Sequence, residues 1–215
     1  MNVDLAAMQT LAAWFSPGYP VGAYSYSHGL EWAVEAGWVT GRESLAAWTA
    51  GLIEHGAGRT DVLLLLAAWR AADPAPVAEL AEALAPSSER HLETMAQGAA
   101  FARTTSAAYG IAVPHAAYPV AVGHAARLLA LPLLPTATLW LQAFAANIVS
   151  AGVRLIPLGQ TDGQIITASL LPLAAKVAAV AVATADPLEA VGGLALAGDL
   201  AAMLHETQYT RLYRS

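Results

Sequence analysis

Several side chains with chemical potential stand close together near the start of the sequence. Residues 16 to 31 read SPGYPVGAYSYSHGLE and include Ser25, Ser27, His28 and Glu31. A serine hydroxyl next to an imidazole suggests a hydrolase. Adjacent residues rarely adopt triad geometry, however, and the stretch has neither the G-x-S-x-G nucleophile motif nor an evident oxyanion donor. A small α-helical hydrolase that uses Ser25 or Ser27 with His28 is therefore only the alternative interpretation.

A metal site is the second chemistry to weigh. His28 and Glu31 have the i, i+3 spacing of one helical turn, but a histidine at a helix start more often bonds to a neighbouring turn. His205-Glu206 begins like the H-E-x-x-H zinc motif, yet Tyr209 stands where the second histidine belongs. No two histidines lie four residues apart, and cysteine is absent. We expect no resident metal and no tight nickel site in the isolated chain.

The third interpretation of residues 16 to 31 is a surface for another protein. Glycines permit close approach, Pro17 and Pro20 stiffen the loop, and tyrosines supply contact area at a low cost in entropy. A second glycine-bearing stretch, LGQTDGQ at residues 158 to 164, contains no lysine and so cannot be a Walker loop. From its spacing alone it is a polar connection between helices, with Thr161 or Asp162 as a cap.

Composition narrows the classes of protein further. The net charge is −6, with ten Lys and Arg residues, which argues against nucleic-acid binding. Hydrophobic residues make up 57% of the chain and charged residues 12%. The apolar runs are too short or too interrupted to cross a membrane, and the N-terminus lacks the basic residue of a secretory signal. We expect a cytoplasmic protein whose surplus apolar surface is covered by partner proteins.

The elements that must position these residues are helices. Apolar residues recur at helical spacing, helix caps and prolines punctuate the chain, and no stretch alternates like a strand. The sequence therefore predicts one all-α domain over residues 1 to 215, with about nine or ten helices. The boundaries are expected near residues 5–15, 40–52, 61–73, 88–109, 119–130 and 137–152, with a further start at Asp186-Pro187. An alanine-rich bundle of this kind is expected to depend on association for part of its stability.

The last residues, HETQYTRLYRS at 205 to 215, have the composition of a docking tail. Continued as a helix, Tyr209, Leu212 and Tyr213 form one apolar stripe, and Arg211 and Arg214 share a neighbouring face. An arginine fork grips a carboxylate at two points. The alternative is that this stripe folds back onto the protein's own core.

Three segments together resemble the urease accessory protein UreF family: SPGYPVGAYSYSHGLE, RLIPLGQTDGQ at 154 to 164, and HETQYTRLYRS. Their order and their distances from the ends also match, so the resemblance spans nearly the whole chain, while the alanine-rich helices between them are not specific. Tyr213 stands where the family usually has phenylalanine, which leaves the burial of this ring open.

The resemblance implies a non-enzymatic, all-α, dimeric maturation factor. Such a protein joins UreD (also called UreH) and the GTPase UreG, and the assembly delivers nickel to apo-urease, with the partner GTPase under its influence. No cofactor is implied. We assign partner binding to residues of the three segments: Tyr24, Ser25, Ser27, His28, Glu31, Gln160, Gln164, Tyr209, Arg211, Leu212 and Arg214.

Overall fold

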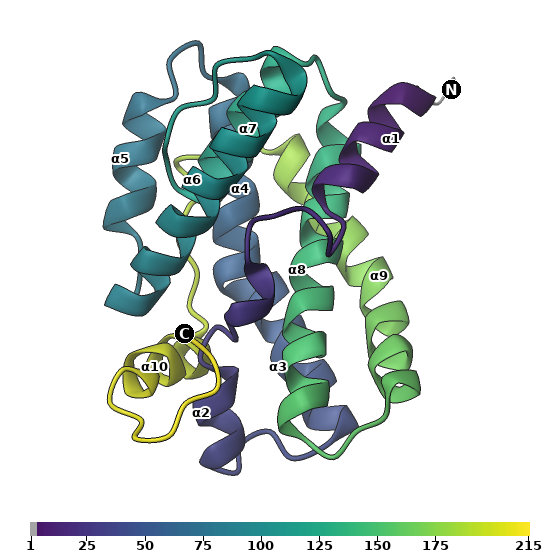
Figure 1. The fold of residues 1–215 in the computed structure, drawn as a ribbon, viewed down its shortest axis with the longest axis vertical. Helices are drawn as coiled ribbons and strands as arrows, with labels where there is room; N and C mark the ends of the chain where they lie inside the picture. The colour runs from purple at the N-terminus through teal and green to yellow at the C-terminus, as the bar shows by residue number, and fades with distance from the viewer. Residues whose placement is uncertain (1–3) are drawn as a thin grey trace.

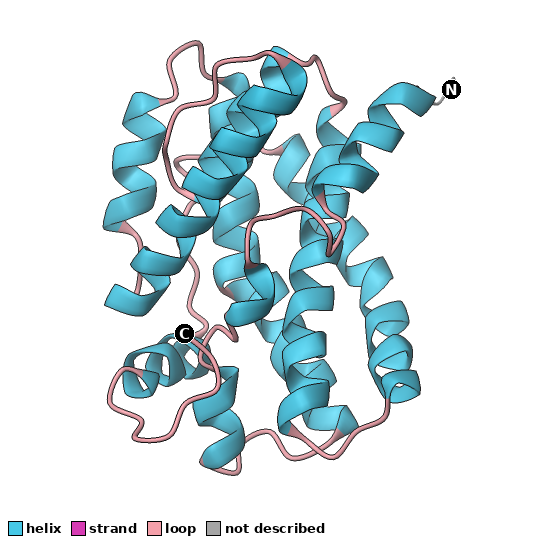
Figure 2. Ribbon diagram, in the orientation of Figure 1, coloured by secondary structure: helices cyan, strands magenta, loops and turns pink. Residues whose placement is uncertain are grey.

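The computed structural model describes residues 4–215, and over this range it is all-α and forms one domain (Figures 1 and 2). Its regular elements are α1 (Leu5–Trp14), a 3-10 turn η1 (Ala23–Ser25), α2 (Leu30–Glu35), α3 (Arg42–His55), α4 (Ala57–Arg70), α5 (Ala75–Ala83), α6 (Ser88–Tyr109), α7 (Tyr118–Leu128), α8 (Leu133–Leu155), α9 (Gln160–Ala183) and α10 (Leu196–His205). The predicted fold class is confirmed.

Local capping rules set several of these boundaries. The Ser87 side chain accepts a hydrogen bond from Arg90 N at 3.2 Å, and Gly110 ends α6 in the left-handed region at φ 67°. Asp162 caps α9, because its carboxylate accepts from Gly159 N at 3.4 Å. The spacing of Thr40 and Glu43 in the sequence predicts a capping box at the start of α3. This prediction is wrong, because Ser44 is the residue that accepts from the backbone N–H groups preceding the helix.

Two predicted helical segments are wrong. The signal at Asp186-Pro187 makes only a turn, in which the Asp186 side chain accepts from Leu188 N at 2.9 Å. The tail does not continue as a helix either, because α10 ends at His205 and residues 206–215 run through turns. As a result Tyr209, Leu212 and Tyr213 do not share one helical face: Tyr209 and Leu212 are exposed, and Tyr213 is buried.

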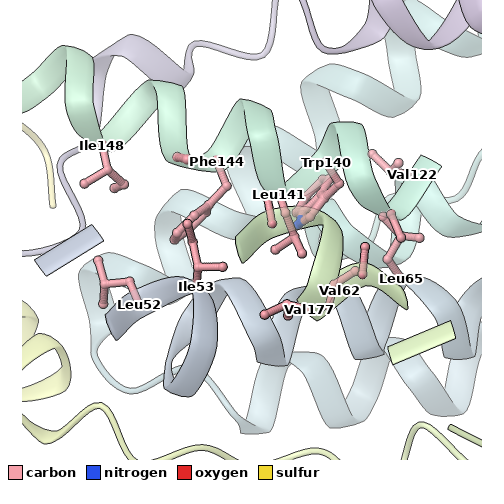
Figure 3. Close-up of a cluster of buried hydrophobic side chains, with 14 of the residues drawn as sticks. Leu52, Ile53, Val62, Leu65, Val122, Trp140, Leu141, Phe144, Ile148 and Val177 are labelled. Carbon is pink, nitrogen blue, oxygen red and sulfur yellow. The ribbon is translucent and has the colours of Figure 1, made fainter. Parts of the chain in front are cut away.

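The main core forms around α8, which contacts α9, α3, α4, α2 and α1. Figure 3 shows Trp140, Leu141, Phe144 and Ile148 of α8 facing side chains of α3, α4 and α9. These positions recur every three or four residues, so one face of the helix is apolar. A smaller buried cluster lies between α4, α5 and α7.

Small residues let the helices approach closely. A Cβ on Gly123 of α7 would lie 2.2 Å from the Leu65 carbonyl oxygen of α4, so glycine is required where these helices cross. Buried alanines on both helices, such as Ala68 and Ala125, extend the close contact. Alanine therefore contributes here through proximity rather than through buried area per side chain.

Both α8 and α9 are long and apolar enough to cross a bilayer by length and composition alone. A core helix of a soluble protein passes the same test, and each of these helices buries a face in this core. Ile148 of α8 and Ile166 of α9 are almost fully inaccessible. The two helices are accordingly weak evidence for a membrane protein.

Candidate protein-interaction site

The opening segment, defined as residues 16–31, and the tail, defined as residues 206–215, lie side by side. Arg214 N donates to Ser25 O at 2.9 Å, and Ser27 N donates to Ser215 O at 2.7 Å. The Ser27 hydroxyl donates to the same carbonyl at 2.5 Å. Figure 1 shows the yellow tail beside α2 and α10, next to the dark purple loop that leads into α2. Two of the three segments that carry the resemblance thus form one structural unit.

The backbone of the opening segment is shaped for this contact. His28 and Gly29 both adopt the left-handed region, at φ 55° and 75°. A Cβ on Gly29 would also lie 2.5 Å from Ala202 N, so α10 crosses directly over this glycine. Gly29 is therefore needed both for its conformation and for the close approach of α10.

Glu31 binds the backbone of the tail. Its carboxylate accepts from Leu212 N at 2.7 Å and from Tyr213 N at 2.8 Å, and it faces His205 Nε2 at 3.3 Å. The other ring nitrogen of His205 lies 2.6 Å from Glu89 Oε2. A histidine satisfies two carboxylates in this way when both ring nitrogens donate. Arg211 donates to the remaining Glu89 oxygen at 2.5 Å, so α2, α6, α10 and the tail share one network.

A second anchor is Glu93 of α6. Its carboxylate pairs with Arg90, faces His28 Nε2 at 3.0 Å, and accepts from Gln97 Nε2 at 3.0 Å and from Ser215 Oγ at 2.6 Å. Burial alone would raise the pKa of Glu93, but the charge of Arg90, helped by His28 and Ser215, holds that pKa well below its usual range. Burial, reinforced by Arg90, lowers the pKa of His28 and favours its neutral ring.

We call the following set the buried polar cluster: His28, Glu31, Glu89, Arg90, Glu93 and His205. An exposed carboxylate, Glu206, adds a cap beside it, accepting from Ser88 N at 2.7 Å and from the Ser88 hydroxyl at 2.6 Å. These bonds from Ser88 lower the pKa of Glu206, as expected for a carboxylate at a helix N-terminus. The tail is thus tied to the N-terminal end of α6 as well as to the opening segment.

The residues assigned to partner binding fall into three groups. Tyr24, Tyr209, Arg211, Leu212 and Arg214 are exposed, with Tyr24 at 68% and Leu212 at 76%. Buried members are Ser27, His28 and Glu31, which hold the unit together, while Ser25 is half-buried. Gln160 and Gln164 are exposed on α9, which Figure 1 places on the opposite side of the molecule from α10.

The geometry does not support the hydrolase alternative. The Ser27 hydroxyl donates to a backbone carbonyl, while the His28 ring faces Glu93 rather than either serine. His28 and Glu31 also contact different residues, Glu93 and His205, instead of forming one metal site. Among residues 4–215 no group of three or more His, Cys, Asp or Glu side chains is arranged to hold a metal ion.

Sequence reasoning missed Glu89, Arg90, Glu93 and Gln97. In the sequence, Leu92, Met95 and Ala99 have the spacing of an apolar helical stripe and predict the buried face of α6, but Leu92 is 61% exposed. The buried face of α6 instead runs through Arg90, Glu93, Gln97 and Phe101. The sequence did contain a signal for this buried face, because these polar residues share the helical spacing of Phe101. A search for stripes of apolar residues alone does not detect it.

Comparison with known proteins gives relatives of one family. The sequence model of the UreF family matches residues 39–171. A protein of Cereibacter sphaeroides (strain KD131 / KCTC 12085) named urease accessory protein UreF is 51% identical over 210 residues, which cover 98% of this chain and 99% of the relative. Proteins of the same name from Ruegeria pomeroyi and Roseobacter denitrificans are 46% and 45% identical, covering 96% and 100% of this chain and 95% and 96% of their own lengths.

Proposed function

The chain belongs to the UreF family of urease accessory proteins, and we propose that it is the scaffold of a UreD/UreH–UreF–UreG complex that delivers nickel to apo-urease. In this proposal the protein works in the cytoplasm as a homodimer and catalyses no reaction itself. It modulates the partner GTPase, and nickel is cargo rather than a resident cofactor. Neither nucleic acid nor a membrane takes part.

One observation carries this proposal: the opening segment and the tail form a single exposed surface. Tyr24 and Leu212 present apolar area there, and Arg214 adds a cation, the residue mixture that protein interfaces favour. The backbone beneath is fixed by Glu31 and Ser27. A surface ordered before binding loses less conformational entropy in a complex than a loose tail would.

The test is urease maturation in cells that co-express the urease operon. Tyr24→Ala and Arg214→Ala should lower urease activity and its nickel content while the helical circular dichroism spectrum stays unchanged. Leu5→Ala is the matched control, because Leu5 is 74% exposed on α1, far from the tail (Figure 1). Normal maturation with both site variants would contradict the proposal.

Deleting residues 206–215 is a poorer test. The deletion removes the buried ring of Tyr213 and leaves Glu31 without two of its donors. We therefore expect the truncated protein to unfold at a lower temperature, which mixes a folding effect with a binding effect.

A further inference from the structure

A cavity of about 730 Å³ lies between the opening segment, α6 and α8. Its volume is within the range of about 300–1,000 Å³ that is usual for binding sites of small organic groups. Much of its wall is aromatic, formed by Trp14, Phe15, Tyr19, Tyr118, Trp140 and Phe144. Aromatic faces bind alkyl chains and also attract cations.

The charged residues of the cavity are unequally compensated. Arg90 and Glu93 pair with each other, His28 is held neutral by its surroundings, and Arg154, which also lines the cavity, donates to Tyr24 O and Ser150 Oγ. Asp61 also lines the cavity, but among residues 4–215 no hydrogen bond or salt bridge reaches its carboxylate. Asp61 therefore lacks the ion-pair partner that Glu93 has in Arg90.

The surroundings of Asp61 disfavour its ionised form, which a bound cation would stabilise. Burial raises the pKa of Asp61 to about 7, although Arg90 acts to lower it and Glu93 adds to the rise. An adjoining cavity of about 150 Å³ shares Asp61 and Arg90 and adds Asp199, whose pKa burial also raises. Two carboxyl groups thus share one arginine that already serves Glu93.

Unsatisfied polar atoms around the cavity point to a missing partner group. His28 is only 8% exposed, and its Nδ1 has no hydrogen-bond partner in the protein. His28 Nε2 lies 3.0 Å from Glu93 Oε1 and 3.2 Å from Arg90 Nη1, and in the tautomer whose Nε2–H donates to Glu93, Nδ1 is left as an acceptor. The indole N–H groups of Trp14 and Trp140 are also buried without acceptors, and as donors they suit an acceptor atom of a ligand rather than its cationic group. Buried polar atoms are normally paired, so this concentration at one cavity is informative.

We propose that the cavity binds an ammonium or guanidinium group, with Asp61 as its counter-ion and the aromatic wall against the remainder of the ligand. The source is either a small organic amine or a lysine or arginine side chain of a partner. This inference does not depend on the proposed function, because the isolated protein should bind the free cation.

The direct experiment is calorimetric titration of the purified protein with butylguanidinium at about pH 8, where Asp61 is ionised. Butyramide and butyrate serve as neutral and anionic probes of similar length. We expect only the cation to bind measurably, and Asp61→Asn should weaken its binding at least about tenfold. Glu79→Gln, on the exposed face of α5, is the control and should leave binding unchanged.

The wild-type protein gives a second readout that needs no variant. A bound cation stabilises ionised Asp61, so binding at about pH 7 should release protons and weaken as the pH falls to about 5.5. Equal affinity of Asp61→Asn, equal binding of butyramide, or no binding of the cation would overturn the proposal. If Asp61→Asn also abolishes co-elution with UreD/UreH or UreG, the natural source is a partner side chain; unchanged co-elution indicates a small amine.

Discussion

The helical core around α8 and the buried polar cluster are held together by different kinds of force. In the core, apolar side chains such as Leu141 and Ile148 pack without direction, and similar residues of similar volume can replace one another. In the cluster each bond needs one particular partner, as when Glu31 accepts from the backbone of the tail. Directional bonds to buried charges therefore determine which segments meet, while apolar contacts supply most of the stability.

The largest loss of stability is expected when one charge is removed from the buried polar cluster. Arg90→Ala leaves buried Glu93 without its counter-charge, and we expect a loss of about 3–5 kcal/mol in the free energy of unfolding. Urea denaturation followed by circular dichroism measures this loss.

A double substitution is the control for Arg90. Arg90→Met with Glu93→Leu removes both charges and keeps most of the volume, so it should be less destabilising than Arg90→Ala. A double variant as unstable as the single one would show that shape, rather than charge pairing, makes this position sensitive.

The second prediction concerns the apolar side of the comparison. Gly123→Ala places a Cβ 2.2 Å from the Leu65 carbonyl oxygen, so α4 and α7 must move apart, at a cost of about 3 kcal/mol. Gly51→Ala in α3 is the matched control, because no atom lies within 4 Å of its added Cβ. That control should stabilise the protein by about 0.5–1 kcal/mol through helix propensity, and equal effects from the two variants would contradict close packing at Gly123.

This difference also explains what the sequence could predict. Helical spacing and caps such as Ser87 are local, and they indicated the fold class and most helices correctly. The prediction of a helical tail failed because the conformation of the tail is determined by contacts with Glu31 and Ser27, about 180 residues away along the chain. Those contacts override the helical spacing of Tyr209 and Leu212.

The candidate site was predicted in part for the same reason. Its segments were identified from their similarity to a family, but the division between exposed Tyr24 and buried Glu31 depends on tertiary contacts. Arg90 and Glu93 were missed because a buried charge has no apolar signature of its own. The family match covers residues 39–171, which include the 154–164 segment, and the full-length relatives cover the two terminal segments as well.

The third prediction uses pH to separate Asp61 from the rest of the polar residues. The pKa of its carboxyl is about 7 in the folded chain against 3.8 ordinarily, so the folded state holds a proton that the unfolded state has lost. Stability from this group is therefore lost as pH rises from about 4 through 7. His28 acts in the opposite direction, because its lowered pKa makes stability fall as pH drops below about 6.5.

Comparing Asp61→Asn with the wild type removes the contribution of His28, which both proteins share. Relative to the wild type, the variant should gain about 2 kcal/mol of stability between about pH 5 and pH 8. Urea midpoints at several pH values measure this gain. Parallel curves for the two proteins would mean that Asp61 does not titrate in this range.

The smallest expected effect on folding is at the exposed residues of the tail. Tyr209 has essentially full exposure and Leu212 is 76% exposed, so Tyr209→Ala and Leu212→Ala should change the free energy of unfolding by no more than about 0.5 kcal/mol. Solvent-exposed apolar side chains on an ordered backbone contribute little to the stability of the isolated chain, but they become buried when a partner covers them. Both substitutions should therefore weaken co-elution with UreD/UreH or UreG on size-exclusion chromatography, while Leu5→Ala leaves it unchanged. A clear loss of stability would show instead that these side chains serve the fold, and unimpaired co-elution by both would place the partner surface elsewhere on the molecule.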